Sequence, residues 1–376
     1  MTIGVAVLGS TGSIGTTALR VLGRHKDRFR VVALTAHSRK DLLAAQAAAF
    51  RPEFVALVGG RDGQDGWRWG QGSLVEAATL PDVEVVLNGI VGAAGLEATL
   101  AALGAGKRVA LANKETLVMA GDLVLEAARA GGGEIVPVDS EHSAVLQCVN
   151  GRPRSDVARI ILTASGGPFH AWDAERVHSA TVQQALNHPT WKMGRKISVD
   201  SATLANKALE VIEGHFLFGL SYDRIDAVVH PQSIVHSFVE FSDGSVLGQI
   251  GFPTMELPIL YALTHPERIA DDGVVRFDPV SAGSLTFEPI RKKVFPAFVL
   301  GVQAGRAGGT APAAFNAANE VAVAAFLRGA MPFGRIAEVI EVVLGRQIVG
   351  PADSVEAVLA ADHWARELAE EVGRCS

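Results

Sequence analysis

Short apolar runs alternate with amphipathic stretches over the first 135 residues. The apolar runs have the length of buried strands and occupy residues 5–8, 29–34, 83–87 and 108–111. The stretches after them repeat apolar residues at helical spacing and occupy residues 16–22, 40–50, 96–103 and 121–130. Strands that alternate with helices in this way are typical of βαβ units. The pattern therefore predicts an α/β N-terminal domain over residues 1–135, built on a doubly wound, Rossmann-like parallel sheet.

A different pattern follows. Strands are expected at residues 159–163, 226–230, 234–241 and 245–250, with Asp243-Gly244 as the hairpin turn between the last two. They indicate a central mixed α/β domain over residues 136–264, and the aperiodic residues 265–290 suggest a linker. Helical spacing returns at residues 294–304, 311–327, 333–344 and 353–372, which predicts a C-terminal helical bundle over residues 291–376.

Composition narrows the classes of function. The net charge of -6 comes without a basic tract, which argues against nucleic acid as the main partner. No apolar run reaches the roughly 18 residues of a membrane-spanning helix, and no basic or cleavable leader precedes the first strand, so a cytoplasmic protein with no membrane partner is expected. Cys148 and Cys375 are too few for a disulfide framework and are expected to be inert thiols.

A glycine-rich turn follows the first predicted strand. Its glycines allow a tight turn and a close approach of a pyrophosphate to the backbone and to the start of the next helix. The spacing GxxGxxG differs from the commoner GxGxxG, and such turns also occur for packing alone. The position on the first strand favours a dinucleotide site. Its residues are Gly9, Ser10, Thr11, Gly12, Ser13, Ile14 and Gly15.

The second strand ends without the carboxylate that usually binds a ribose hydroxyl. Ser38, Arg39 and Lys40 stand there, and these groups suit a 2′-phosphate, which favours NADP(H) over NAD(H). The alternative is that Arg39 and Lys40 are a solvated helix start. A later strand ends at Asn113-Lys114-Glu115, the usual location of residues that face a bound ligand.

Two acidic residues lie close together after another apolar run. On an extended chain Asp139 and Glu141 would point the same way and repel each other, unless a cation neutralised both. Carboxylates without His or Cys suit a hard ion such as Mg²⁺ or Mn²⁺. A surface loop with two solvated acids is the commoner alternative.

The segment 187–210 carries further polar groups. A helix that begins near Ser201 would place Asn206, Lys207 and Glu210 on one face. Glu210 could complete the cation site, and the hydroxyl, amide and ammonium groups suit a phosphate monoester. Lys207 and Glu210 could instead form an ordinary surface ion pair. Ser165, in a turn after a strand, has two interpretations as well: a substrate hydrogen bond or a structural turn.

His188 lies in a loop with Trp191 and Met193. Basic groups and an aromatic ring in one loop are consistent with a lid over an anionic substrate, and a core role for the histidine is about equally supported.

These residues together resemble the 1-deoxy-D-xylulose 5-phosphate (DXP) reductoisomerase family. The matching motifs follow in order over nearly the whole chain: Gly9-Ser-Thr-Gly-Ser-Ile-Gly15, Leu111-Ala-Asn-Lys-Glu115, Val138-Asp-Ser-Glu-His142, Ser165-Gly-Gly-Pro-Phe169, His188-Pro-Thr-Trp-Lys-Met-Gly-Arg-Lys196, Val199-Asp-Ser-Ala-Thr203, Asn206-Lys207, His230-Pro-Gln-Ser233 and Asn316-Ala-Ala-Asn-Glu320. The resemblance implies rearrangement and NADPH-dependent reduction of DXP to 2-C-methyl-D-erythritol 4-phosphate in non-mevalonate isoprenoid synthesis. It also implies a homodimer, a catalytic and dimerisation domain, and a lid at residues 186–196.

The resemblance also implies roles for single residues. Asp139, Glu141 and Glu210 would hold Mg²⁺, Mn²⁺ or Co²⁺. The substrate would be bound by Ser140, Ser165, His188, Ser201, Asn206 and Lys207, with Trp191 and Met193 in the lid. Gly194 and Met255 would contact the cofactor, Met255 near the nicotinamide. Ala164, where many relatives have glycine, and the variable 37–40 segment are mild departures, and the second leaves the 2′-phosphate contacts open.

Two other classes compete with this interpretation. A semialdehyde or homoserine dehydrogenase would share the layout, but the sequence lacks a suitably framed catalytic Cys. An NADP-binding sensor would need only the N-terminal domain and would leave the cation and phosphate groups without a purpose.

Overall fold

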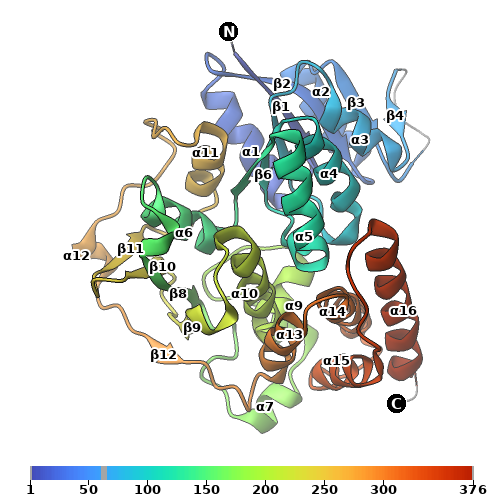
Figure 1. Cartoon of the computed structure of the whole chain (residues 1–376), viewed down its shortest axis with the longest axis vertical. Coiled ribbons are helices and arrows are strands. Elements are labelled where there is room, and N and C mark those ends of the chain that lie inside the picture. Colours follow the sequence, from blue (N-terminus) through green and yellow to red (C-terminus); the bar gives the residue numbers. More distant parts are fainter. Residues whose placement is uncertain (1, 61–65, 375–376) are drawn as a thin grey trace. The chain divides into compact units, whose positions relative to one another are not determined.

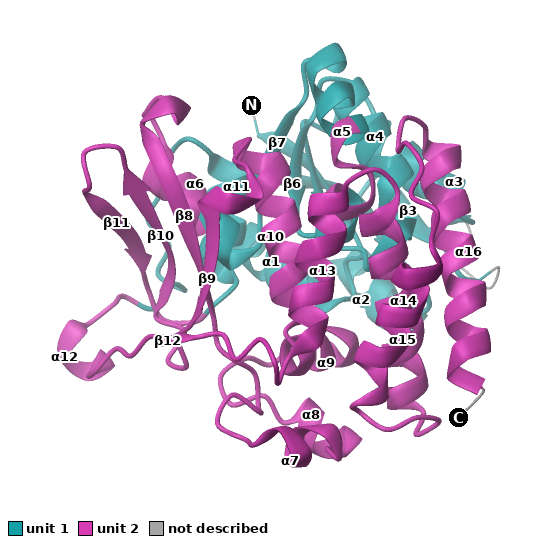
Figure 2. Ribbon diagram, turned by 60° about the horizontal axis from the view of Figure 1, so that its bottom comes forward, with its two compact units in different colours: residues 1–116, 123–143, 254–275 teal, residues 117–122, 144–253, 276–376 magenta. Residues whose placement is uncertain are grey.

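The computed structural model describes residues 2–60 and 66–374 and contains two compact units (Figures 1 and 2). Unit 1 comprises Met1–Thr116, Leu123–Ser143 and Thr254–Val275, and unit 2 comprises Leu117–Asp122, Ala144–Pro253 and Arg276–Ser376. The division of the chain into three domains with a linker stays a prediction. Cys148 is buried, whereas Cys375 lies outside the described residues.

Unit 1 is built on a seven-stranded parallel sheet with the strand order β4-β3-β2-β1-β5-β6-β7. The order reverses between β1 and β5, so the predicted doubly wound sheet is confirmed. Its strands are β1 (Ile3–Leu8), β2 (Phe29–Ala36), β3 (Phe54–Leu57), β4 (Arg68–Trp69), β5 (Val85–Asn88), β6 (Arg108–Leu111) and β7 (Glu134–Pro137). The central strand β1 is apolar and almost wholly buried, as expected for a strand covered on both faces.

Helices connect these strands. They are α1 (Ser13–Arg24), α2 (Lys40–Phe50), α3 (Gly72–Thr79), the 3₁₀ turn η1 (Gly92–Gly95), α4 (Leu96–Gly104), α5 (Lys114–Gly131) and α6 (Ser140–Val149), of which α5 and α6 run partly through unit 2. A later helix, α11 (Glu256–Thr264), also belongs to unit 1. Arg24 of α1 binds Glu256 at 2.7 Å and Asp271 at 2.9 Å, so ion pairs attach the segment 254–275 to α1.

Unit 2 contains a five-stranded mixed sheet with the order β11-β10-β8-β9-β12. The strands are β8 (Val157–Ala164), β9 (Ile225–Val229), β10 (Val235–Phe241), β11 (Val246–Ile250) and β12 (Glu288–Pro289). The hairpin predicted at Asp243-Gly244 joins β10 to β11, with Gly244 at a φ of 83° and the Ser245 amide donating to Asp243 at 2.9 Å. A mixed central sheet is therefore confirmed.

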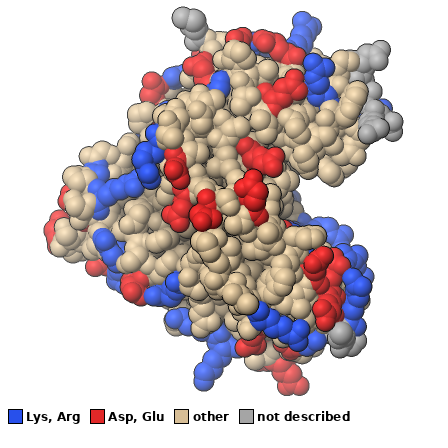
Figure 3. All heavy atoms as spheres, turned by 45° about the vertical axis from the view of Figure 1, so that its right-hand side comes forward, with Lys and Arg blue, Asp and Glu red and all other residues tan. Residues whose placement is uncertain are grey.

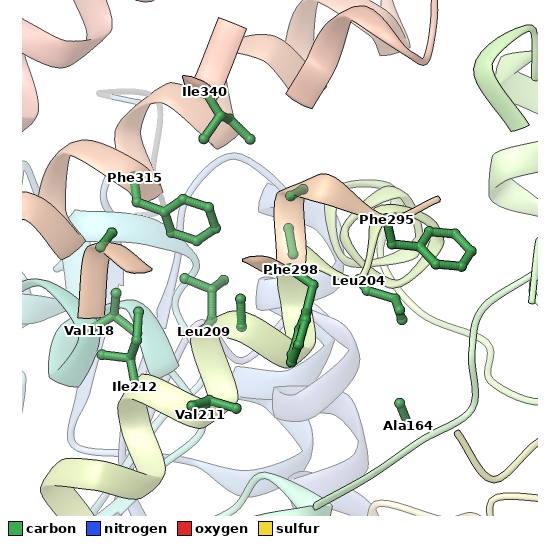
Figure 4. Packing of buried hydrophobic residues seen from close by; sticks show 14 of the residues in the cluster. Val118, Ala164, Leu204, Leu209, Val211, Ile212, Phe295, Phe298, Phe315 and Ile340 are labelled. Carbon is green, nitrogen blue, oxygen red and sulfur yellow. The ribbon is translucent and has the colours of Figure 1, made fainter. Parts of the chain in front are cut away.

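The remaining helices lie in unit 2. They are α7 (Ala174–His178), α8 (Val182–Leu186), α9 (Arg195–Thr203), α10 (Ala205–Phe218), α12 (Pro279–Ala282), α13 (Pro296–Ala307), α14 (Ala311–Leu327), α15 (Arg335–Arg346) and α16 (Val355–Arg374), with short 3₁₀ turns η2 (Arg154–Asp156) and η3 (Tyr222–Arg224). The last four long helices confirm the predicted C-terminal helical region. They share one hydrophobic core with the sheet, in which Leu209 and Ile212 of α10 join Phe315 of α14 and Ile340 of α15 (Figure 4).

Both acidic and basic side chains are visible on the face shown in Figure 3, and several acidic ones gather near its middle. Within residues 2–60 and 66–374, the helices are all too short or too polar to cross a membrane.

Candidate active site

The glycine-rich turn connects β1 to α1 at the point where the strand order of unit 1 reverses. Gly9 has a φ of 79°, which favours glycine, and a Cβ on Gly15 would lie 2.4 Å from the Gly9 carbonyl oxygen. Gly12 occupies the N-cap of α1, and no side chain caps the helix there. Backbone N–H groups at an uncapped helix start suit an anion, so the turn fits a pyrophosphate.

A buried residue that the sequence did not reveal supports this turn. Gln46 of α2 accepts a hydrogen bond from the Ser10 hydroxyl at 2.7 Å and donates to the Ser10 carbonyl at 2.9 Å. Both side chains are buried, although a glutamine within a helix is usually exposed. No local signal marks Gln46, because its role depends on how α2 packs.

Ser38, Arg39 and Lys40 are exposed just after β2. The Arg39 guanidinium donates to the Thr11 carbonyl at 2.8 Å, so it lies beside the glycine-rich turn. This location agrees with a contact to the phosphate of a bound nucleotide. The individual contacts to a 2′-phosphate stay a prediction.

The segment after β6 is buried, and its side chains form hydrogen bonds within the fold. Asn113 accepts from the Thr116 amide at 2.8 Å, and its amide nitrogen donates to the carbonyls of Ile90 at 2.6 Å and Gly92 at 2.9 Å. Asn113 therefore caps α5 and joins two loops at the carboxyl ends of β5 and β6. Glu115 is buried in the first turn of α5.

The two acidic residues after β7 do not lie on an extended chain, which corrects the sequence expectation. Helix α6 begins at Ser140, Asp139 precedes it, and Glu141 lies in its first turn, with the Glu141 amide donating to Asp139 at 3.2 Å. Carboxylate oxygens of Asp139 and Glu141 still come within 4.8 Å of each other. Lys114 partly balances their charge through an ion pair of 2.5 Å to Asp139, and the Ser140 hydroxyl donates to Glu141.

The polar segment of unit 2 forms two helices and not one, because Leu204 adopts a φ of 59° between α9 and α10. Ser201 consequently lies on α9, apart from the three residues of α10. Lys207 is 3% exposed and Glu210 is 1% exposed, and they form an ion pair. Asn206 also donates to Glu210. Burial of this extent excludes the ordinary surface ion pair that the sequence left open.

Lys207 also donates to the Thr163 carbonyl at 2.6 Å, at the end of β8. The next residues turn at Gly166-Gly167, and a Cβ on Gly167 would lie 2.6 Å from the Ser201 carbonyl oxygen. Ser165 therefore lies on a turn packed directly against the end of α9. Within unit 2 the structure brings together the predicted residues Ser165, His188, Ser201, Asn206, Lys207 and Glu210.

The hydrogen bonds of His188 define its protonation. Its Nδ1 accepts from the Thr190 amide at 3.1 Å and the Trp191 amide at 2.9 Å, so the ring proton lies on Nε2. Nε2–H then donates to the Ser165 hydroxyl oxygen at 2.9 Å. Burial lowers the pKa of His188 to about 4, which keeps the ring neutral at physiological pH.

The loop around His188 has no regular structure between Asn187 and Gly194, and Gly194 forms the N-cap of α9. The Trp191 ring centroid lies 6.3 Å from that of His236, a buried residue that the sequence analysis did not select. Met193 is half-buried in this loop. Met255 belongs to unit 1, where it forms the N-cap of α11.

Comparison with known proteins decides the family. Three family models match the chain: 1-deoxy-D-xylulose 5-phosphate reductoisomerase at residues 5–121, its C-terminal domain at residues 135–218, and the DXP reductoisomerase C-terminal domain at residues 250–368. A 1-deoxy-D-xylulose 5-phosphate reductoisomerase of Ralstonia nicotianae is 50% identical over 97% of both chains. This chain belongs to the DXP reductoisomerase family.

Other DXP reductoisomerases agree in sequence and in structure. The Gloeobacter violaceus relative is 49% identical over 96% of this chain and 95% of its own. A solved Zymomonas mobilis reductoisomerase in complex with NADPH has a TM-score of 0.92 and 39% identity, with full coverage of both chains. A DOX-P reductoisomerase in complex with NADPH, fosmidomycin and magnesium has a TM-score of 0.93 and 40% identity over 99% of this chain and 98% of that chain.

Proposed function

We propose that this chain uses the side chains described above to convert DXP into 2-C-methyl-D-erythritol 4-phosphate. As a member of the DXP reductoisomerase family, it is an NADPH- and divalent-metal-dependent oxidoreductase of isoprenoid precursor synthesis. The observation that carries the residue assignment is the buried group around Lys207 and Glu210, which a nucleotide-binding protein alone would not need.

The proposed metal ligands are Asp139 and Glu141 of unit 1 and Glu210 of unit 2. The short separation of the Asp139 and Glu141 oxygens fits a cation, and oxygen donors without Cys suit Mg²⁺ or Mn²⁺. When bound, the ion would polarise substrate oxygens as a Lewis acid and NADPH would supply a hydride. Lys114 and Ser140 hold the two carboxylates of unit 1 in orientation through the contacts above.

The proposed phosphate site lies in unit 2. The Ser165 oxygen accepts from His188 Nε2–H and from the Gly167 amide at 3.2 Å, so its own proton is directed to a third partner. We assign that partner as an oxygen of the substrate phosphate. Lys207 supplies a buried positive charge, and Ser201 and Asn206 supply a hydroxyl and an amide. Fixing the phosphate would orient the substrate for the rearrangement.

The proposed lid is the predicted segment 186–196, whose irregular part runs from Asn187 to Gly194. Trp191 and Met193 would cover the bound substrate and exclude water, which protects a reactive aldehyde from side reactions. The proposed cofactor contacts are the glycine-rich turn, Ser38, Arg39 and Lys40, the Asn113-Lys114-Glu115 segment, Gly194 and Met255. The uncapped start of α1 would bind the pyrophosphate through backbone N–H groups.

The test follows NADPH absorbance after the purified protein is mixed with DXP, with Mg²⁺ or Mn²⁺ and again after chelation. Metal-dependent oxidation of NADPH is expected. The matched variant Asp139→Asn keeps the size of the side chain and should lose most turnover while binding NADPH normally. NADPH binding without DXP-dependent oxidation in the wild type would contradict the proposed function.

Two further proposals concern assembly and location. We propose a homodimer formed through the sheet of unit 2, because the edge strand β11 exposes Val246, Leu247 and Ile250. Light scattering should give twice the chain mass, and Leu247→Lys should shift the protein to the monomer. A cytoplasmic location is proposed as well, and cell fractionation would test it.

A further inference from the structure

The motif Asn316-Ala-Ala-Asn-Glu320 has no part in the proposed reaction, although it lies in a helix that is otherwise almost entirely apolar and buried. Asn316 and Asn319 are both 0% exposed on α14. The side-chain nitrogens of both amides have hydrogen-bond partners, whereas their side-chain oxygens have none among the described residues, and an unpaired buried polar atom destabilises the fold. The partners of this motif therefore indicate what it does.

Asn319 connects α14 to α9. Its side-chain nitrogen donates to Asp200 Oδ1 at 2.8 Å, and Asp200 is also 0% exposed. The other oxygen, Asp200 Oδ2, lies 2.8 Å from Lys196 Nζ, one turn earlier on α9. A wholly buried carboxylate is thus balanced by a neutral donor on one side and an ammonium on the other.

Both ends of this short chain of contacts reach functional elements. Lys196 lies in the first turn of α9, two residues after Gly194, where the lid loop ends. Asp200 precedes Ser201, whose carbonyl contacts the Gly166-Gly167 turn next to Ser165. A displacement of α9 would therefore move a phosphate-binding residue and the C-terminal end of the lid together.

Helix α14, which carries Asn319, is in turn held by contacts with α16. Asn316 donates to Glu320 at 3.2 Å, and Glu320 pairs with Arg366 of α16 at 2.6 Å. Arg366 also binds Asp362 at 2.7 Å. Asn319 consequently joins α9 to a helix pair that a separate set of ion pairs stabilises.

We propose that Asp200 and Asn319 are positioning residues that hold α9, so that Ser201 and the end of the lid keep their productive places without touching the substrate. This inference rests on the proposed phosphate site and lid. Loss of the Asn319 donor should allow α9 to shift, which weakens substrate binding and leaves the nucleotide site of unit 1 unaffected.

The main experiment compares Asn319→Ala with Glu320→Gln, the next residue on the same helix, which breaks the Arg366 pair and keeps the Asp200 contact. For N319A we expect an approximately tenfold rise in KM for DXP, because a shifted α9 would weaken about one charge-assisted hydrogen bond from Ser201 to the phosphate, with kcat within about threefold of wild type and unchanged NADPH affinity. E320Q should lower Tm with KM unchanged. Hydrogen exchange at residues 195–203 should increase in N319A and not in E320Q. Should N319A be too unstable to purify, Asn319→Ser serves the same comparison.

A rescue variant separates positioning from general stability. Asn319→Asp places two buried carboxylates together and should raise KM further, whereas adding Asp200→Asn restores one donor and one acceptor and should bring KM back toward wild type. A lower Tm for N319A with an unchanged KM, or a double variant no better than N319D, would overturn the proposal. An inactive wild type would instead contradict the proposed function, so the two failures are distinguishable.

Discussion

The glycine-rich turn of unit 1 and the proposed phosphate site of unit 2 are formed by different parts of the chain. The first is mostly backbone: a glycine at positive φ, a helix start without a side-chain cap, and a neighbour so close that Gly15 admits no Cβ. The second is mostly side chains: Lys207 and Glu210 are buried on α10, and His188 is half-buried in a loop and binds Ser165 of another turn. A backbone site depends on short-range sequence, and a side-chain site depends on the packing that buries it.

The largest effect should come from a charge in the side-chain site. Glu210→Gln keeps the shape of a buried residue but removes a proposed metal ligand and the partner of Lys207. We expect kcat to fall by roughly 10²–10³-fold, as when one strong electrostatic group is removed from an active site. NADPH affinity, measured by fluorescence titration, should be unchanged. Asp223→Asn, at an exposed residue, is the control. A loss of NADPH affinity in Glu210→Gln would contradict the prediction that the two sites act separately.

The backbone site should fail in the opposite way. Gly15→Ala places a methyl group about 2.4 Å from a backbone oxygen, and overpacking of this kind costs about 1–3 kcal/mol. NADPH affinity should therefore fall by roughly tenfold or more. Gly104→Ala, which meets no atom within 4 Å, is the matched control in the same unit. Equal NADPH affinities for the two variants would show that the turn is not the binding element.

A smaller effect is expected where a side chain supplements the backbone site. Arg39→Gln removes the guanidinium beside Thr11 and should raise KM for NADPH by about tenfold through the loss of a charge-assisted contact. KM for NADH should hardly change. The measurement is the ratio of the KM values for NADPH and NADH. An equal change of both KM values would show that Arg39 supports the glycine-rich turn and does not contact the 2′-phosphate.

The smallest effect concerns pH. Burial lowers the pKa of His188 from 6.5 to about 4, so the unfolded chain binds more protons than the folded one between these values. The contribution of neutral His188 is complete above pH 6.5 and is lost as pH falls toward about 4. Relative to His188→Gln, the wild type should lose on the order of 1 kcal/mol of unfolding free energy over this window, after allowance for solvent screening.

Denaturant unfolding at several pH values would measure this difference, with the exposed His178→Gln as control. A difference between wild type and His188→Gln that does not change with pH would show that His188 titrates alike in the folded and unfolded chain.

Comparison of the pattern with the structure shows where sequence reasoning works. The strand β6 and the helix α14 begin and end where the apolar spacing predicts, because each signal is local and strong. The helix expected near Ser201 breaks at Leu204, whose left-handed backbone no propensity would predict. The extended chain expected around Asp139 is a helix start, since α6 begins at Ser140.

Residues that act through distant partners were the hardest to find. Gln46, His236 and the contact between Asp200 and Asn319 carry no local signature, because their neighbours come from far along the chain. The motifs that contain Asn319 and Asp200 were both visible in the sequence, but the hydrogen bond between them was not. The structure shows that Asn319, in a polar motif whose purpose the sequence did not reveal, connects α14 to α9 through Asp200.

The sequence by itself determined the alternation of strands and helices, the glycine-rich turn and the set of chemically capable side chains, because periodicity and backbone requirements act over a few residues. Tertiary structure decided which of those side chains are buried and paired. It excluded a surface role for Lys207 and Glu210, set the protonation of His188 and tied Asp200 to Asn319. The physical reason is that desolvation and hydrogen-bond geometry depend on groups that only folding brings together.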